Sequence, residues 1–361
     1  MNAPELKRFD VVGEIPRGEN NPRNSEGDFI RLDDGTILFA YSRYTGTDAD
    51  DDCPCDIAGM ISTDNGESFS PLPELLVTAK AHNTLNIMSV TLRRLFDGTV
   101  ALFYLCKKGS QSEYYLRKME KNSIKFGAPI CCIPKKDNIY YVVNNCRVEI
   151  LEDGRVLIPA ARHQIRNENE TDYFGSCQIF CGDKNGENWT EYSEIIEMQN
   201  PGYSHTGLQE PGLCRPADGR LYAYFRTDRC FQYESFSSDE GKTWTVPNAS
   251  RFTSATSPML ITKNPYSGIY YAFWNPVPNY NGRITNGKWV HDGRFPFVMA
   301  QSENGIDFSP LKALEDKPDH GYCYPSVLFL NEKEFLISYC CGGEEDGNCL
   351  TRLRLRKAEI E

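Results

Sequence analysis

The octapeptide Asp-Gly-Arg-Leu-Tyr-Ala-Tyr-Phe at residues 218–225 is one copy of the unit that decides the fold. The Asp-Gly pair predicts a tight turn, and the apolar and aromatic residues after it favour a β-strand. The same order of turn and strand recurs at 34–41, 97–104 and 153–159, with the Asp-Gly pairs 56 to 65 residues apart. Looser copies at 267–274 and 331–339 bring the number of units to six.

A second motif recurs at an offset from the first. Residues 62–69 read Ser-Thr-Asp-Asn-Gly-Glu-Ser-Phe, residues 237–244 read Ser-Ser-Asp-Glu-Gly-Lys-Thr-Trp, and looser versions lie at 182–189 and 302–308. Asp and Asn side chains bond the local backbone in such turns, and glycine adopts the positive φ that the turn requires. The motif is typical of a β-hairpin tip, so we assign its residues a structural role.

The repeats predict the architecture. Their spacing accommodates a four-stranded antiparallel sheet with loops in each copy, and long amphipathic helices are missing from the sequence. Radially repeated sheets of this size form propellers. We therefore expect an all-β, six-bladed β-propeller of four-stranded antiparallel sheets that occupies residues 1–361 as a single domain, with its ligand at the central mouth.

Composition narrows the function classes. The net charge of −11 disfavours a nucleic-acid partner, because binding phosphates requires a basic stripe. An anionic substrate would have to be held by a few positioned arginines instead.

No apolar run reaches the roughly 18 residues that span a bilayer, and the first ten residues lack an apolar signal core. These features predict a cytoplasmic protein without a membrane partner, and they do not indicate an oligomeric state.

The fourteen cysteines do not read as a disulfide framework. Several form adjacent pairs or lie in apolar strand patterns, where cysteine behaves as a small buried hydrophobe; these are Cys131, Cys132, Cys146, Cys177, Cys214, Cys340 and Cys341. Cys53-Pro-Cys55 resembles half of a zinc site, but no second half with suitable spacing follows. The pattern predicts no metal site and favours a reducing compartment.

Residues 207–226 contain a candidate functional pair. Glu210 precedes the Asp-Gly turn of its repeat, and Arg226 ends the strand that follows the turn. A hairpin of two antiparallel strands would bring both side chains to the same edge of a sheet. A carboxylate and a guanidinium there can activate a nucleophile and hold an anion, although a surface ion pair is the simpler interpretation of these two residues alone.

Taken together, the repeats and the hairpin tips resemble the sialidase (neuraminidase) superfamily, whose Asp box the tip motif resembles. The run Asn-Pro-Arg-Asn-Ser-Glu-Gly-Asp at residues 21–28 is similar to a bacterial branch of that family. The resemblance covers nearly the whole chain. It implies that three arginines clamp a substrate carboxylate, that a Tyr–Glu pair supplies the nucleophile and that an aspartate acts as acid and base, with no metal or organic cofactor.

The resemblance places the three arginines at Arg23, Arg226 and Arg294. The family's Arg-Ile-Pro is absent at the first position, because Arg23 is followed by Asn24 and Ser25. The alternative there is a loop arginine bound to Glu26 or Asp28. Further substrate-binding residues are expected at the same mouth, and these are Asn24, Arg43, Asn145, Arg147, His163 and Gln209.

The catalytic groups are placed in the same way. Glu210 matches the glutamate of the Tyr–Glu pair, and Asp51 is favoured as acid/base among the aspartates of residues 48–52, any of which can instead belong to a solvated acidic run. The nucleophile is expected in Tyr-Cys-Tyr-Pro at 322–325. Because side chains alternate along a strand, Tyr322 and Tyr324 are both candidates pointing the same way, and Tyr322 is narrowly preferred.

The resemblance thus predicts an exo-acting glycoside hydrolase of sialidase type, which releases a terminal α-linked sialic acid or a related acidic sugar from a glycan. Fold does not fix the substrate, so a hydrolase or lyase acting on a uronate is an alternative. Another is a propeller that binds glycans or proteins without catalysis. That alternative predicts that Glu210, the tyrosines and the acidic loop do not converge.

Overall fold

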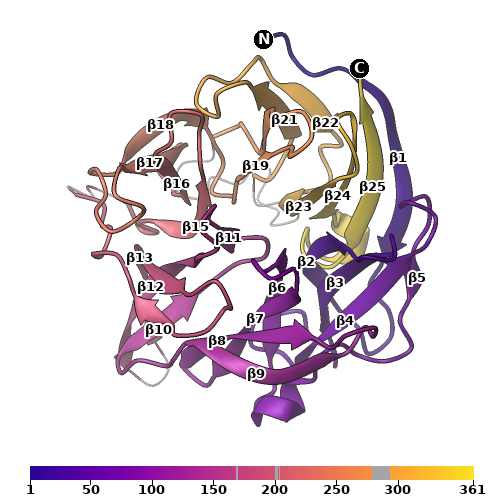
Figure 1. Ribbon diagram of the computed structural model, residues 1–361, viewed down its shortest axis with the longest axis horizontal. Helices are drawn as coiled ribbons and strands as arrows, with labels where there is room; N and C mark the ends of the chain where they lie inside the picture. Colours follow the sequence, from indigo (N-terminus) through magenta and orange to yellow (C-terminus); the bar gives the residue numbers. More distant parts are fainter. Residues whose placement is uncertain (168–169, 200–201, 203, 279–292) are drawn as a thin grey trace.

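Six antiparallel sheets stand around a central axis in the computed structural model, which describes residues 1–167, 170–199, 202, 204–278 and 293–361 (Figure 1). The first blade contains β2 (Asn24–Arg31), β3 (Ile37–Tyr44), β4 (Cys55–Ser62) and β5 (Ser70–Pro71). The second contains β6 (Ile87–Arg94), β7 (Val100–Lys108), β8 (Gln111–Met119) and β9 (Phe126–Ile133). The prediction of an all-β, six-bladed propeller is confirmed.

The third blade differs because its innermost strand is split. It contains β10 (Ile139–Val142), β11 (Glu149–Ile150), β12 (Val156–Asn167), β13 (Glu170–Gly182) and β14 (Thr190–Glu191). Both β10 and β11 pair with β12. The fourth blade contains β15 (Gln209–Cys214), β16 (Leu221–Arg226), β17 (Phe231–Ser237) and β18 (Asn248–Thr253). The fifth contains β19 (Leu260–Lys263), β20 (Tyr270–Trp274), β21 (Phe297–Ser302) and β22 (Lys312–Glu315).

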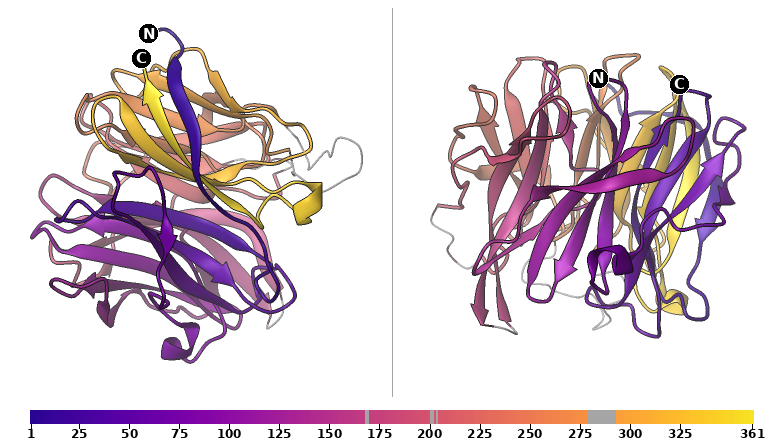
Figure 2. Two further views of the ribbon diagram at one scale, coloured as in Figure 1. Left: turned by 90° about the vertical axis from the view of Figure 1, so that its right-hand side faces the viewer. Right: turned by 60° about the horizontal axis from the view of Figure 1, so that its bottom comes forward.

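The two ends of the chain meet in the sixth blade. Its strands are β23 (Cys323–Phe329), β24 (Glu334–Cys340), β25 (Leu353–Ile360) and, as the outermost strand, β1 (Leu6–Ile15). Because β1 pairs antiparallel with β25, the beginning of the chain closes the ring (Figure 2). Two short 3₁₀ helices, η1 (Ala79–His82) and η4 (Glu344–Asp346), lie outside the sheets, and no helix in the described residues is long and apolar enough to span a membrane.

Both sequence motifs form the turns that were predicted. The Asp-Gly units join the first and second strands of their blades, and the second motif joins the third and fourth strands. At one such tip the Ser237 hydroxyl accepts from the Gly241 amide at 2.8 Å, and Asp239 accepts from the Thr243 amide at 2.9 Å. These bonds use the polar side chains within the turn, which accounts for their recurrence.

The core is divided into six buried apolar clusters, each built mainly from two neighbouring blades. Phe39 of the first blade and Leu336 of the sixth share one such cluster. None of the fourteen cysteines, all of which the structure describes, forms a disulfide, and the ten buried ones contribute as apolar side chains. Each blade is therefore held by its neighbours, and the positions of loops at the central mouth are fixed on both sides.

The innermost strands carry a feature that alternation does not predict. Glu26, Ser89, Glu210 and Tyr324 have positive φ values of 54°, 60°, 47° and 54°. Each lies where the pairing between the first and second strands of its blade shifts register, which marks a β-bulge. A non-glycine residue in this region costs on the order of 1–3 kcal/mol, so its repetition in four blades indicates a functional constraint.

Candidate active site

The four bulge residues line one cavity of about 1030 Å³ at the central mouth. It also receives several residues predicted from the sequence, namely Asp51, His163, Gln209, Arg226 and Arg294. The cavity therefore collects side chains from the first to the sixth blade. Two of them, Glu210 and Tyr324, are separated by 114 residues in sequence.

Glu210 is the centre of the hydrogen-bond network. Its Oε1 accepts from the Tyr324 hydroxyl at 2.6 Å and from Nη1 of Arg226 at 2.8 Å. The Arg294 guanidinium carbon lies 5.5 Å from the centre of the Tyr324 ring. A phenol hydrogen-bonded to a carboxylate, with two guanidinium groups alongside, can lose its proton to that carboxylate and act as a nucleophile.

Burial sets the protonation state of the tyrosine. Removal from water, together with the neighbouring Glu210 charge, raises the pKa of Tyr324 well above its ordinary value. The phenol is therefore neutral in the free protein at neutral pH. Burial also lowers the pKa of His163, whose Nδ1 lies 3.0 Å from the Asp172 carbonyl oxygen, so this imidazole is neutral as well.

Tyr322 lies outside this cavity. It packs in the cluster between the fifth and sixth blades, whereas Tyr324 packs in the cluster between the sixth and first blades. The two rings are thus on opposite faces of the sixth blade, and the expectation that they point the same way is wrong. The reason is the positive φ of Tyr324, which interrupts the alternation of side chains along the strand.

Arg23 is not among the residues that line this cavity. Only 2% of its surface is exposed, and its Nη1 donates to Asp51 Oδ1 at 2.6 Å. Its Nη2 lies 3.7 Å from Glu26 Oε1, while Asp28 pairs with Arg93. Partial removal from water would raise the pKa of Asp51, but the Arg23 charge and hydrogen bond outweigh this effect and lower the pKa below the usual value.

Of the other acidic-loop residues, Asp52 also lines the cavity, where it pairs with Lys107. Asp48 accepts a bond from the next backbone amide at 2.7 Å and belongs to the turn. Asp51 remains the one with a buried arginine as partner, and its side chain is 63% exposed. This combination of an anchored and an accessible carboxylate suits a group that meets both protein and substrate.

Four further predicted residues do not line the cavity. The Asn24 amide donates to Pro16 and Asn21, and the Asn145 amide donates to the carbonyl oxygens of Gly27 and Tyr324. The Asn145 amide thus braces the backbone of the bulges in the first and sixth blades. Arg43, opposite Asn24 in β3, is not among the lining residues, and Arg147 lines a different cavity. Gln209, by contrast, does line the cavity, and its amide donates to the Tyr173 carbonyl oxygen at 2.8 Å.

Glu26 is a site residue that sequence reasoning missed. It is 2% exposed, it lines the cavity, and its Oε2 accepts from the Ser89 hydroxyl at 2.6 Å. Burial raises its pKa to about 7, even though the Arg23 charge opposes this. The signal in the sequence was the glycine that follows Glu26, since a glycine inside a strand often marks a bulge. In the structure a Cβ at this glycine would lie 2.3 Å from the Phe39 ring, so no larger residue fits there.

Comparison with known proteins places the fold in a family. Residues 73–337 match the model of the BNR repeat-like domain. The chain belongs to the BNR repeat-like domain family. No curated protein matches this BNR repeat-like chain in sequence.

Solved structures with a similar fold include proteins of different function. One is a protein of unknown function from Dyadobacter fermentans, with a TM-score of 0.72, 16% identity, and coverage of 99% of this chain and 100% of the other. The Hadza microbial sialidase has a TM-score of 0.71 at 13% identity, covering 98% and 68%. The α-L-arabinanase of Penicillium chrysogenum has a TM-score of 0.62 at 11% identity, covering 99% of each. At such identities the likeness shows that the BNR repeat-like chain shares their propeller.

The residues that the model describes contain no group of three or more His, Cys, Asp or Glu side chains able to hold a metal ion. Carboxylates, arginines and a phenol line the cavity. Glu210, Asp51 and Tyr324 line the same cavity. This convergence is the opposite of what the alternative of a non-catalytic binding propeller predicts.

The raised pKa of Glu26 makes a prediction about stability. A carboxyl whose folded pKa of about 7 exceeds its ordinary value of 4.5 stabilises the fold fully below pH 4.5, and this contribution is lost as pH rises through 7. Glu26→Gln removes the titration. Relative to the wild type, we expect its free energy of unfolding to increase by about 2 kcal/mol between pH 5 and pH 8.5 in urea titrations.

The control for this prediction is Glu67→Gln. Arg8 and Lys357 hold the pKa of Glu67 down to about 2, so that carboxyl stays ionised over the same interval. Its difference from the wild type should be nearly constant from pH 5 to pH 8.5. A flat difference for Glu26→Gln as well would show that Glu26 is ionised in the folded protein.

Proposed function

We propose that the protein is an exo-acting glycoside hydrolase of sialidase type that releases a terminal α-linked sialic acid or a related 2-keto acid sugar. The observation that carries this proposal is the 2.6 Å hydrogen bond between the Tyr324 hydroxyl and Glu210, with Arg226 on the same carboxylate oxygen. The similarity of fold to the Hadza microbial sialidase supports it.

The choice of a phenol as nucleophile follows from the substrate. A sialic acid carries a carboxylate on its anomeric carbon, and this charge would repel a carboxylate nucleophile but not a neutral phenol. Tyrosine nucleophiles are accordingly an exception among glycosidases, which mostly use two carboxylates. As the Tyr324 oxygen bonds to the anomeric carbon, its proton passes to Glu210 and the glycosidic bond breaks. Water then releases the sugar from the tyrosine.

Asp51 is proposed as the acid and base of this reaction. In the free protein Arg23 holds it ionised, which is the wrong state for donating a proton to the leaving oxygen. Arg23 does not line the cavity in the free protein, so it could bind a substrate carboxylate only if Asp51 gives up its bond to Arg23. Losing that bond and gaining a negative charge nearby would both raise the pKa of Asp51. Substrate binding would thereby produce the acid form, and the resulting carboxylate would later activate water.

Arg23, Arg226 and Arg294 are the proposed carboxylate clamp. Arg226 and Arg294 line the cavity, and the side chain of Arg226 is 11% exposed. Charge-assisted bonds from guanidinium groups are strong in such partly dehydrated places, and their planar geometry matches a carboxylate. Gln209, His163 and Asn144 line the same cavity and are proposed to contact the sugar hydroxyls.

The substrate class is tested by turnover of an aryl α-sialoside against a panel of aryl uronides and arabinosides. We expect release of the aryl group from the sialoside, with product analysis separating free sugar from an anhydro or unsaturated form. The uronides stay in the panel because a fold does not fix the substrate. The similar fold of an α-L-arabinanase illustrates this, and it is the reason for including arabinosides. Turnover of uronides alone would overturn the sialidase assignment while keeping the glycosidase class.

The nucleophile is tested by a pair of tyrosine variants. Tyr324→Phe should lower kcat at least about 1000-fold, because the attacking oxygen is removed while the ring still packs. Tyr322→Phe, on the opposite face of the same blade, should keep nearly the wild-type kcat. Circular dichroism melting of both variants checks that the fold is retained. Equal loss in the two variants would contradict the assignment of Tyr324.

The clamp is tested at Arg226. Arg226→Lys keeps the charge but loses the planar guanidinium fork. We expect transition-state stabilisation to weaken by about 2–5 kcal/mol, which lowers kcat/KM roughly 30- to several-thousand-fold. Arg220→Lys is the matched control, because Arg220 pairs with Asp218 in the exposed turn of the same hairpin. Similar kcat/KM values for the two variants would reduce Arg226 to a structural ion pair.

A further inference from the structure

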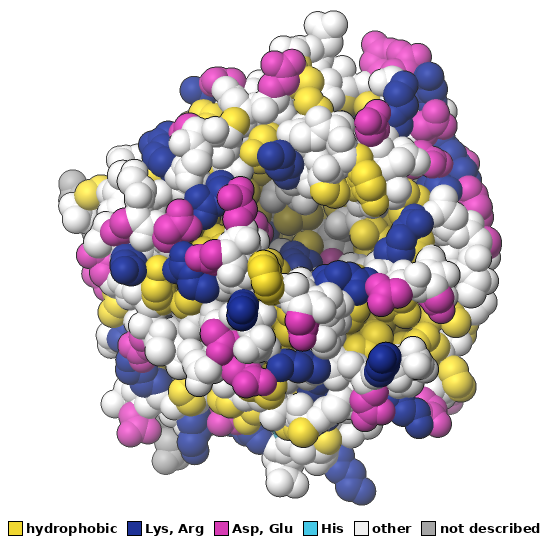
Figure 3. Space-filling model, viewed as in Figure 1, with side chains coloured by type: hydrophobic (Ala, Val, Ile, Leu, Met, Phe, Trp, Pro, Cys, Tyr) yellow, Lys and Arg dark blue, Asp and Glu magenta, His cyan; other side chains and the backbone are white. Residues whose placement is uncertain are grey.

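A second cavity opens at the other end of the same inner strands. It has a volume of about 510 Å³, and in β15 it is lined by Leu213 and Cys214, whereas Gln209 and Glu210 of that strand line the first cavity. Its wall follows the Asp-Gly turns of the third and fourth blades. Figure 3 shows a face of the protein that is hollowed at its centre, with Lys and Arg side chains around the hollow.

Four cations line this cavity, and two of them are already neutralised. Arg93 pairs with Asp28 at 2.8 Å, and Arg215 pairs with Glu240 at 2.6 Å. The other two are Arg147 and Lys263. Arg147 was predicted to bind the substrate, but the structure places it here, past the left-handed Cys146 in the gap between β10 and β11.

Arg147 is buried without a counter-charge. It is 5% exposed, its Nη1 donates to the Tyr224 hydroxyl at 3.2 Å, and its guanidinium carbon lies 5.6 Å from that ring. Its Nε has no hydrogen-bond partner, and no carboxylate among the described residues forms an ion pair with it. Lys263 likewise meets only the ring of Tyr270, at 5.1 Å, in the described part of the chain.

A buried charge of this kind is costly unless an opposite charge or several hydrogen bonds compensate it. Glu149 also lines the cavity, but burial raises its pKa to about 7, so that a large part of it is uncharged at neutral pH. Arg147, which is buried, and Lys263, which is exposed, therefore face the same cavity without an ion pair among the described residues, and the other carboxylate of the lining, that of Glu152, is exposed. We propose that this cavity binds a small oxyanion with two negative charges, of the phosphate or dicarboxylate type, held between Arg147 and Lys263.

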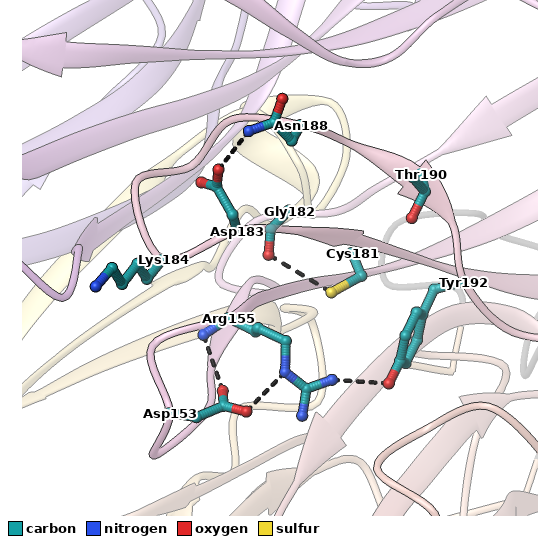
Figure 4. A pocket seen from close by; sticks show the side chains of 9 residues that line it. All are labelled: Asp153, Arg155, Cys181, Gly182, Asp183, Lys184, Asn188, Thr190 and Tyr192. Carbon is teal, nitrogen blue, oxygen red and sulfur yellow. Dashed lines mark hydrogen bonds and ion pairs between the residues drawn. The ribbon is translucent and has the colours of Figure 1, made fainter.

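A nearby pocket shows the contrast. In Figure 4 Arg155 lines a shallow pocket beside the Asp-Gly turn of the third blade. Its Nε donates to Asp153 at 2.7 Å and its Nη1 to the Tyr192 hydroxyl at 2.7 Å. This arginine already has its anion, so an added oxyanion gains little there. The difference between the two pockets lies in the missing carboxylate and not in the number of arginines.

The test measures binding of inorganic phosphate and, separately, of malonate to the full chain by calorimetry and by thermal melting. Ionic strength is held constant with sodium chloride. We expect saturable binding of at least one of the two anions to the wild type. The anion with the higher affinity identifies the type of oxyanion that the cavity prefers. Stabilisation that sodium chloride reproduces at the same ionic strength would overturn the proposal.

Variants locate the site, since the first cavity also contains arginines. Lys263→Met and Arg147→Gln should each weaken the affinity at least about tenfold, the loss expected for one charge-assisted contact. Arg155→Gln should bind as the wild type does. Lys263 is exposed, so this variant keeps the test decisive if Arg147→Gln does not fold. Unchanged affinity in Lys263→Met would refute the proposal, and no glycoside enters the measurement, so the outcome is independent of the catalytic assignment.

Discussion

The candidate active site depends on one backbone constraint, the left-handed bulge repeated in the innermost strands. In a regular strand, neighbouring side chains alternate between the two faces of the blade and pack against adjacent blades. A bulge residue with positive φ breaks this alternation. Glu26, Ser89, Glu210 and Tyr324 adopt it, and all four line the same cavity. The conformational cost is offset by the neighbouring core clusters, which hold each strand on both faces.

The electrostatics of the cavity follow from the same placement. Bulges bring ionisable groups into a space where little water compensates them, so each group needs a partner within the protein. Arg226 and Tyr324 share Glu210, while Arg23 serves both Asp51 and Glu26. The overall charge of −11 plays no part in this local arrangement, because the arginines are buried and individually positioned. An acidic protein can therefore still place two arginines at one cavity.

Much of the fold could be predicted from the sequence, because both repeated motifs are local turns whose residues bond their own backbone. The Glu210–Arg226 pair was also predictable, since one hairpin sets its geometry. Tyr322 and Tyr324 show where such reasoning stops. Their orientation depends on a bulge, and the only local sign of it is that Tyr324, like Glu210, precedes a proline that cannot donate to the strand ladder. The position of Arg147 was equally hidden, because the split between β10 and β11 directs that segment to the other cavity.

The pairing of β1 with β25 has a consequence for synthesis of the protein. The sixth blade needs residues from both ends of the chain, and the same blade supplies Tyr324. Its contacts are thus among the longest-range in the sequence, which makes ring closure a late step in folding. A nascent chain emerging from the ribosome can build its early blades in order, but the Tyr324–Glu210 pair cannot form until the last blade has emerged. The candidate active site is consequently the final part to assemble, and a translation product that lacks the last blade cannot contain it.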